Sequence, residues 1–175
     1  AQLCDYVFTS AAEMVDRYAA DCPRAKAIGV LPFSVDFEHH NPIGSRRHRL
    51  DDVVFAGSWH NHKYPERRNA AYQIFDGVIA SGRRLRIIDR NWELGQEKYR
   101  FPQHYLPYVE PAIAHDELLR IHRTSDIAIN LNSVVDSTSM YANRVVELQA
   151  MSCTVLSNYN ARVKDRFPNV YMPES

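Results

Sequence analysis

Two kinds of apolar segment alternate along the chain from residue 52 to residue 158. Short continuous apolar runs, such as DVVFAGS at 52–58 and IAINLN at 127–132, are typical of strands buried on both faces of a parallel sheet. The segments between these runs carry apolar residues at helical spacing. The pattern predicts strands at 52–58, 84–90, 108–109, 127–132 and 154–158, and helices at 67–80, 116–122 and 140–151. It therefore predicts an α/β fold, with a parallel sheet and helices on both of its faces.

The first 50 residues carry a separate pattern. It predicts strands at 6–9 and 27–31 and a helix at 11–20. Ser10 and Glu13 have the spacing of a capping box at the start of that helix. Residues 33–50 have no periodic apolar pattern and are expected to be a linker. Because the chain opens directly into one apolar run and stops just after another, we expect it to be part of a longer protein.

Composition and charge narrow the classes of function. Acidic and basic side chains balance at 21 each, so no overall field favours nucleic acid or an anionic membrane. No apolar run approaches the ~20 residues that cross a bilayer, and no signal peptide is recognisable. We therefore expect a cytoplasmic protein without a transmembrane segment. The three cysteines lack paired spacing, and His60 with His62 lacks a third ligand, so we expect no metal site.

Polar residues follow three of the predicted strands, where ligands bind in an open parallel sheet. The first group consists of Gly57 and Ser58, followed by His60, Tyr64 and Arg67. Gly57 lets the backbone turn closely after the strand, and Arg67 is placed to face a phosphate from the next helix. The same residues also fit a simple turn and a solvated loop, and the pattern leaves both interpretations open.

The second group is Asp89 and Arg90, which follow the strand predicted at 84–90. A nucleotide base or ribose would fit beside them, with Trp92 as a stacking surface. A structural ion pair explains the two charges equally well.

The third group lies at the start of the helix predicted at 140–151. If the helix opens near Ser139, free amides at Ser139, Met140 and Tyr141 and the helix dipole favour a diphosphate there. Arg144 and Glu147 are three residues apart and share a helical face, so the guanidinium suits phosphate and the carboxylate suits a ribose diol. An exposed salt bridge worth a few tenths of a kcal/mol is the alternative.

The stretch SMYANRVVELQAMSCTVLSN, residues 139–158, resembles the donor-binding segment of group 1 glycosyltransferases of the GT-B fold. In that superfamily a conserved Glu precedes an Ala-Met-Ala-Cys-Gly turn and a buried strand; here Glu147 has this place, and Thr154 replaces the Gly. The closer resemblance is to CgeB-like (spore maturation protein) glycosyltransferases. It rests on DVVFAGS, on the Arg after Tyr-Pro-Glu, on IIDR, and on the Asn-Leu-Asn-Ser loop.

The resemblance implies two Rossmann-like domains with the active site between them. Residues 1–42 would be the end of the N-terminal domain and the interdomain linker, since FSVDFEHHNP resembles the hinge of these enzymes. Residues 43–175 would be the C-terminal domain, which binds a nucleotide-diphosphate sugar without metal or cofactor. Glu147 would hold the ribose and Arg144 the diphosphate. Ser58 would face the phosphate or sugar, and Asp89-Arg90 would lie near the base. The acceptor domain would be missing, so the fragment alone is expected to be inactive.

One position departs from the family pattern. Many retaining members carry a second Glu eight residues before the conserved one, and Ser139 stands there. The sequence does not specify whether the transfer retains or inverts the configuration of the sugar. It also leaves open the base and sugar of the donor, the acceptor, the oligomeric state and any catalytic residues on the missing domain. The alternative function is a non-catalytic nucleotide-binding or interaction module of the same fold. A nicotinamide dehydrogenase is disfavoured because no G-x-G-x-x-G follows a predicted strand.

Overall fold

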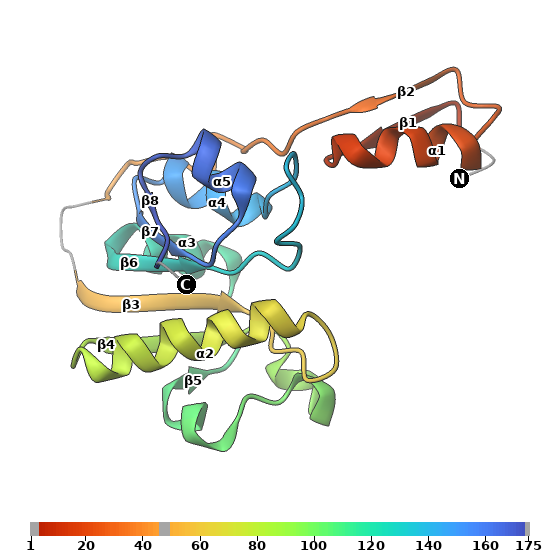
Figure 1. Ribbon diagram of the computed structural model, residues 1–175. Coiled ribbons are helices and arrows are strands. Elements are labelled where there is room, and N and C mark those ends of the chain that lie inside the picture. Colours follow the sequence, from red (N-terminus) through yellow and green to blue (C-terminus); the bar gives the residue numbers. More distant parts are fainter. Residues whose placement is uncertain (1–3, 46–49, 174–175) are drawn as a thin grey trace.

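The computed structural model of the chain, which describes residues 4–45 and 50–173, contains a six-stranded parallel sheet (Figure 1). Its strand order is β5-β4-β3-β6-β7-β8, and every neighbouring pair is parallel. The strands are β3 (Leu50–Gly57), β4 (Arg84–Asp89), β5 (Val109–Glu110), β6 (Ser125–Asn130), β7 (Thr154–Ser157) and β8 (Val170–Tyr171). The chain builds outward from β3 to β5, then returns to β6 beside β3 and builds the other way. The sheet therefore has a topological switch point between β3 and β6.

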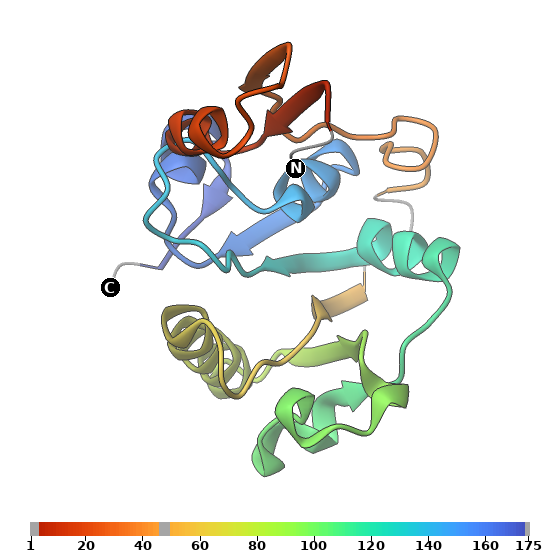
Figure 2. The same ribbon diagram turned by 90° about the vertical axis from the view of Figure 1, so that its right-hand side faces the viewer.

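Helices cover both faces of this sheet, as predicted. They are α2 (Pro65–Ala80), α3 (His115–Thr124), α4 (Asn143–Ala150) and α5 (Ala161–Arg166). The side of β3 that carries Val53 and Phe55 packs with α2, while Val54 faces Ile121 of α3. Figure 2 shows α2 on one side of the strands and α3 on the other. Burial on both faces explains the continuous apolar run of β3, because neither side of the strand meets water.

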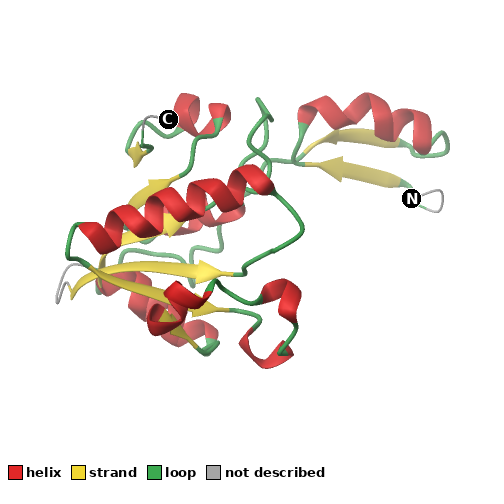
Figure 3. Cartoon of the chain, turned by 60° about the horizontal axis from the view of Figure 1, so that its bottom comes forward, coloured by secondary structure: helices red, strands yellow, loops and turns green. Residues whose placement is uncertain are grey.

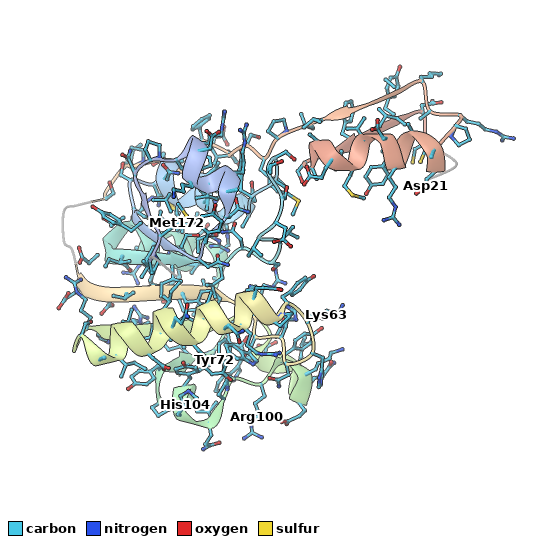
Figure 4. The ribbon with its side chains drawn as sticks, in the orientation of Figure 1. Asp21, Lys63, Tyr72, Arg100, His104 and Met172 are labelled. Atoms are coloured by element: carbon cyan, nitrogen blue, oxygen red, sulfur yellow. The ribbon has the colours of Figure 1, made fainter. Side chains whose placement is uncertain are left out.

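Residues 91–107, for which the apolar pattern predicts no element, lie in three short 3₁₀ helices: η2 (Trp92–Leu94), η3 (Glu97–Tyr99) and η4 (Gln103–Tyr108). Tyr108, predicted to start a strand, ends η4, and β5 begins one residue later. Their aromatic residues complete the core under α2. Tyr105 is fully buried and its hydroxyl donates a 2.7 Å hydrogen bond to Asp76. His104 stacks on Tyr72 of α2 with ring centroids 6.1 Å apart, and Figure 4 shows both side chains on this part of the molecule.

The N-terminal segment forms a separate unit, with β1 (Tyr6–Thr9), η1 (Ala12–Met14), α1 (Val15–Asp21) and β2 (Ala27–Val30). β1 and β2 pair in parallel as a two-stranded sheet that stands away from the main sheet (Figures 1 and 3). The predicted capping box is wrong: Ala11 precedes the first turn with no side-chain cap, and Glu13 bonds to Ser139 instead. The predicted linker joins the two units, and Arg123 holds it by donating to the carbonyl of Asn41 at 3.0 Å.

No helix within residues 4–45 and 50–173 has both the length and the apolar character needed to span a bilayer. In the same residues, no cluster of three or more His, Cys, Asp or Glu side chains is arranged around a common point where an ion would sit.

Candidate functional site

A cavity of about 290 Å³ opens at the carboxyl ends of β3, β4 and β6, where the strand order reverses. We call it the switch-point pocket. Its polar lining consists of Gly57, Ser58, His60, Arg67, Arg90, Asn130, Ser133 and Arg144. Six of these eight belong to the twelve site residues predicted from the sequence, and they come from all three predicted groups. The end of β3 and the start of α4, which are more than 80 residues apart in the chain, therefore meet at one pocket.

The switch-point pocket is cationic. Arg67, Arg90 and Arg144 contribute to its wall, and none of its described lining residues is acidic. A guanidinium stays charged at every physiological pH and presents several N–H donors. Because three guanidinium groups line the pocket and no carboxylate does, the pocket favours an anionic ligand with several acceptor oxygens, such as a diphosphate.

Arg67 is buried at the first turn of α2, with 8% of its surface exposed. The turn starts from Tyr64, whose left-handed φ of 55° brings the chain into Pro65. One guanidinium nitrogen donates to the carbonyl of Ser58 at 3.1 Å, and the group lies 5.9 Å from the centroid of the Phe55 ring. Among the described residues no carboxylate lies within 4.0 Å of it to form an ion pair. Burial lowers the pKa of Arg67, which marks the cost of placing a charge there.

Three buried polar atoms of the pocket residues have no hydrogen-bond partner among the described residues. They are Ser58 Oγ, Arg67 Nε and Asn130 Oδ1. A buried polar atom left without a partner costs about 1–3 kcal/mol, so each one calls for an explanation. Arg67 Nε–H needs an acceptor and Asn130 Oδ1 needs a donor, whereas the Ser58 hydroxyl can take either.

Helix α4 carries Arg144 into the pocket wall, but Glu147 is not among the lining residues. The Glu147 carboxylate lies one turn deeper, between α4 and the linker. It accepts a 2.6 Å hydrogen bond from the Asn143 amide, is 3.4 Å from Arg144 Nε, and lies 4.0 Å from His40 Nε2. The pair is partly buried, with 34% of the Arg144 side chain and 18% of the Glu147 side chain exposed. The i,i+3 ion pair that was considered as the alternative is therefore present, but it is partly buried rather than exposed.

The predicted helix start near Ser139 is wrong, because α4 begins at Asn143. Two of the three predicted free amides are also occupied: Ser137 Oγ accepts from the amides of Ser139 at 3.3 Å and Met140 at 2.7 Å. A side chain in the loop thus satisfies the groups assigned to a ligand. At the start of α4 itself, the amide of Ala142 donates to Asn132 Oδ1 at 3.0 Å and that of Val145 to the carbonyl of Ala142 at 3.1 Å.

Ser139 and Tyr141 contact the N-terminal unit and linker rather than the pocket. The Ser139 hydroxyl accepts from the amide of Ala12 at 2.8 Å and donates to the Glu13 carboxylate. Hydrogen bonds from Ser137 and Ser139 lower the pKa of Glu13. Tyr141 is buried, and its hydroxyl donates to the carbonyl of Phe33 at 3.3 Å.

Asp89 and Arg90 point to opposite sides of the end of β4. Arg90 lines the switch-point pocket, whereas Asp89 lines a second cavity of about 340 Å³ together with Trp92 and Tyr99. The Asp89 carboxylate accepts from the amide of Asn91 at 2.8 Å, and burial raises its pKa. The alternative of an ion pair between Asp89 and Arg90 is not found among the described residues.

His60 lines the switch-point pocket, and its ring neighbours Tyr99, which lines the second cavity. Its ring lies 5.8 Å from the Tyr64 ring and 5.4 Å from the Tyr99 ring, centroid to centroid. Burial, followed by the charges of Arg67, Lys63 and Arg90, lowers the pKa of His60. The imidazole is therefore neutral at pH 7 and can donate or accept a hydrogen bond at the edge of the pocket.

Sequence reasoning missed Asn130 and Ser133 in the pocket wall and His122 behind it. Asn130 could have been found, because an amide that ends an apolar strand lies at the same sheet edge as Gly57. His122 carried no such signal, since a histidine on the inner face of a helix is ordinarily a packing residue.

No family model matches the sequence, and no curated protein matches it. Solved structures do resemble its fold. AviGT4, a glycosyltransferase involved in avilamycin A biosynthesis, aligns at 19% identity with a TM-score of 0.56, over 92% of this chain and 47% of its own. The N-terminal domain of trehalose-6-phosphate phosphatase from Candida albicans aligns at 13% identity with a TM-score of 0.52, over 97% and 47%. Sucrose-phosphate synthase from Thermosynechococcus elongatus aligns at 16% with a TM-score of 0.48, over 92% and 42%.

The chain thus spans about half the length of the solved structures it resembles. At these identities the likeness shows the fold alone. The fold is a Rossmann-like α/β fold with a glycosyltransferase among its structural neighbours, and the predicted fold class is confirmed.

Proposed function

We propose that this chain is the donor-binding half of a GT-B glycosyltransferase, similar to the CgeB-like group, and that a nucleotide-diphosphate sugar binds in the switch-point pocket. The observation that carries the proposal is the combination of three arginines, no lining carboxylate, and three buried polar atoms without partners. Arg144 already pairs with Glu147 at 3.4 Å, but a neutral or cationic ligand would leave Arg67 and Arg90, which have no ion pair among the described residues, uncompensated. A diphosphate supplies the negative charge and the acceptors for Ser58 Oγ and Arg67 Nε, while Asn130 Oδ1 would need a donor such as a sugar hydroxyl or a base N–H.

The pocket has two chemically distinct parts. Arg67 and Arg144 suit the diphosphate, because a guanidinium donates charge-assisted hydrogen bonds to phosphate oxygens. Ile88, Ile113 and Leu118 form an apolar part that suits the flat face of a base. Arg90 lies with this lining, whereas Asp89 does not, so only Arg90 keeps its proposed place near the base.

Gly57 lines the switch-point pocket at the end of β3, where packing against Phe55 leaves no room for a side chain. A Cβ at this position would lie 2.8 Å from the Phe55 ring, so no other residue fits without moving that ring. Ser58 Oγ, directly after it, is one of the unpartnered atoms. Glu147 keeps its proposed ribose role only if its carboxylate exchanges the Asn143 amide for the ribose hydroxyls.

The chemistry that follows is stabilisation of a leaving group. Transfer of the sugar releases a nucleoside diphosphate, and fixed cations around its oxygens stabilise the charge that develops in the transition state without a metal ion. The acceptor and any base would come from an N-terminal domain, of which residues 1–42 are the end. Tyr6 and Phe8 on β1 are each 59% exposed, and a two-stranded parallel sheet with an open apolar face is typical of part of a larger domain.

Calorimetric titration with uridine, guanosine and thymidine diphosphates tests the proposal. One of the three should bind, and Arg144→Ala should weaken it by about 1.5–3 kcal/mol, as for a charged hydrogen bond, without affecting the free nucleoside. Glu147→Ala should weaken nucleoside and diphosphate alike, because both contain the ribose.

Arg120→Ala is the control, since this exposed arginine pairs with Glu117 at 3.9 Å outside the pocket. If Arg144→Ala weakens nucleoside and diphosphate binding equally, Arg144 does not bind the diphosphate. If none of the nucleotides binds, the donor site is refuted and a non-catalytic interaction module takes its place.

A further inference from the structure

Arg144 is held from behind by a buried histidine. His122 of α3 is 1% exposed, and its Nε2 lies 3.2 Å from Arg144 Nη1. On its other edge the guanidinium contacts Glu147, 3.4 Å from Nε. Two of the three guanidinium nitrogens therefore have protein partners, and the side chain still lines the switch-point pocket.

The contact determines the tautomer of His122. Arginine only donates, so Nε2 must accept, and the ring proton must lie on Nδ1. Burial, the Arg144 charge and then His40 lower the pKa of His122 to about 3, which keeps the ring neutral and Nε2 free to accept. Nδ1 is buried and has no hydrogen-bond partner among the described residues.

This arrangement does not favour stability. A buried Nδ1–H without an acceptor costs about 1–3 kcal/mol, comparable to what the bond between His122 and Arg144 contributes. An apolar side chain of similar volume would fill the same space with no polar atom to satisfy. The imidazole thus supplies something that packing does not, and its one hydrogen bond among the described residues is with the pocket arginine.

We propose that His122 is a positioning residue for anion binding: it fixes the guanidinium of Arg144 in the wall of the switch-point pocket, aimed at the diphosphate. This inference rests on the proposed function and adds to that site a residue that acts on the ligand through Arg144. Without the contact at Nη1, Arg144 keeps its charge but gains freedom to rotate about its long side chain. Its N–H donors are then ordered only when the ligand binds, at a cost in affinity.

A matched pair of variants separates positioning from packing. His122→Leu removes the acceptor and keeps an apolar group of similar volume. His122→Gln places an amide oxygen near the position of Nε2 and so keeps an acceptor for Arg144. The probes are inorganic pyrophosphate, the tightest-binding nucleoside diphosphate from the panel above, and its free nucleoside, each titrated by calorimetry alongside thermal unfolding.

His122→Leu should weaken pyrophosphate and nucleoside diphosphate by roughly 3- to 10-fold, the worth of one hydrogen bond. It should leave the nucleoside unchanged and should not lower the unfolding temperature. His122→Gln should restore most of the loss. A purely structural role predicts instead that both variants lower the unfolding temperature and weaken all three ligands together.

The two proposals fail separately. If Arg144→Ala weakens the diphosphate but His122→Leu binds it like the wild type, the positioning role is overturned and the donor site stands. If the wild-type chain binds no nucleoside diphosphate, the proposed function is overturned and the positioning role with it.

Discussion

Replacing Arg67 by methionine separates the stability of the fold from the binding of an anion. Methionine keeps the unbranched aliphatic stem that packs near Phe55 and removes the guanidinium. In the folded chain that guanidinium is buried, makes one hydrogen bond to Ser58, and leaves Nε unpartnered. The variant therefore loses the favourable hydrogen bond to Ser58. It also no longer has to bury a charged group, which is unfavourable.

The expected magnitudes follow from these contacts. Loss of the bond to the Ser58 carbonyl costs about 1.5–3 kcal/mol, as for a hydrogen bond to a charged group. Relief of the buried N–H and of the unpaired charge returns a similar amount, about 1–3 kcal/mol. The free energy of unfolding should thus change by no more than about 1 kcal/mol, or ~2–4 °C in the unfolding temperature. Diphosphate binding should fall by about 1.5–3 kcal/mol, which is roughly 10- to 150-fold.

Urea unfolding and calorimetric titration with the same nucleoside diphosphate measure the two quantities on one preparation. Arg120→Met serves as the control, since it removes an exposed guanidinium outside the pocket and should alter neither quantity. A variant at Arg67 that loses more than about 3 kcal/mol of stability while binding the diphosphate normally would show that the charge serves the fold. The reasoning from unpartnered pocket atoms would then be refuted.

Two further predictions concern stability. Gly57→Ala places a Cβ 2.8 Å from the Phe55 ring, which is 3% exposed, so urea unfolding should show a loss of about 1–3 kcal/mol; an unchanged midpoint would mean that the ring moves freely. His122 has a pKa of about 3 when folded against 6.5 for the free side chain, so the unfolded chain binds a proton that the folded chain does not. Between these pH values stability should therefore fall with falling pH by up to about 1.4 kcal/mol per unit, and His122→Gln should abolish that contribution; identical pH profiles would contradict it.

Some features of the site could be predicted because they depend on local pattern. The apolar run of β3 ends at Gly57 and Ser58, and a strand end in a parallel sheet lies at the ligand edge whatever the rest of the chain does. The position of Arg144 in the pocket wall could also be predicted, because it lies on the helix that follows β6. The opposite directions of Asp89 and Arg90 could also have been deduced. Side chains alternate along a strand, so Asp89 continues the side of Ile87 and Arg90 the side of Ile88.

Other features depend on contacts between distant segments, which a pattern of residue types does not encode. The start of α4 was misplaced because Ser137 captures the amides of Ser139 and Met140 from within the loop. The roles of Ser139 and Glu13 were misjudged because these residues, 126 positions apart, bond to each other across the two units.

The amino-acid pattern by itself determined the class of fold, since the alternation of buried strands and one-sided helices admits few arrangements other than a parallel sheet covered on both faces. Only the tertiary structure decided which polar groups are left without partners. Whether a buried hydroxyl, amide or guanidinium is satisfied depends on ångström-scale distances to groups far away in the chain. That is why the unpartnered atoms of Ser58, Arg67 and Asn130 within the described residues, and the contact between His122 and Arg144, could be found only in the folded chain.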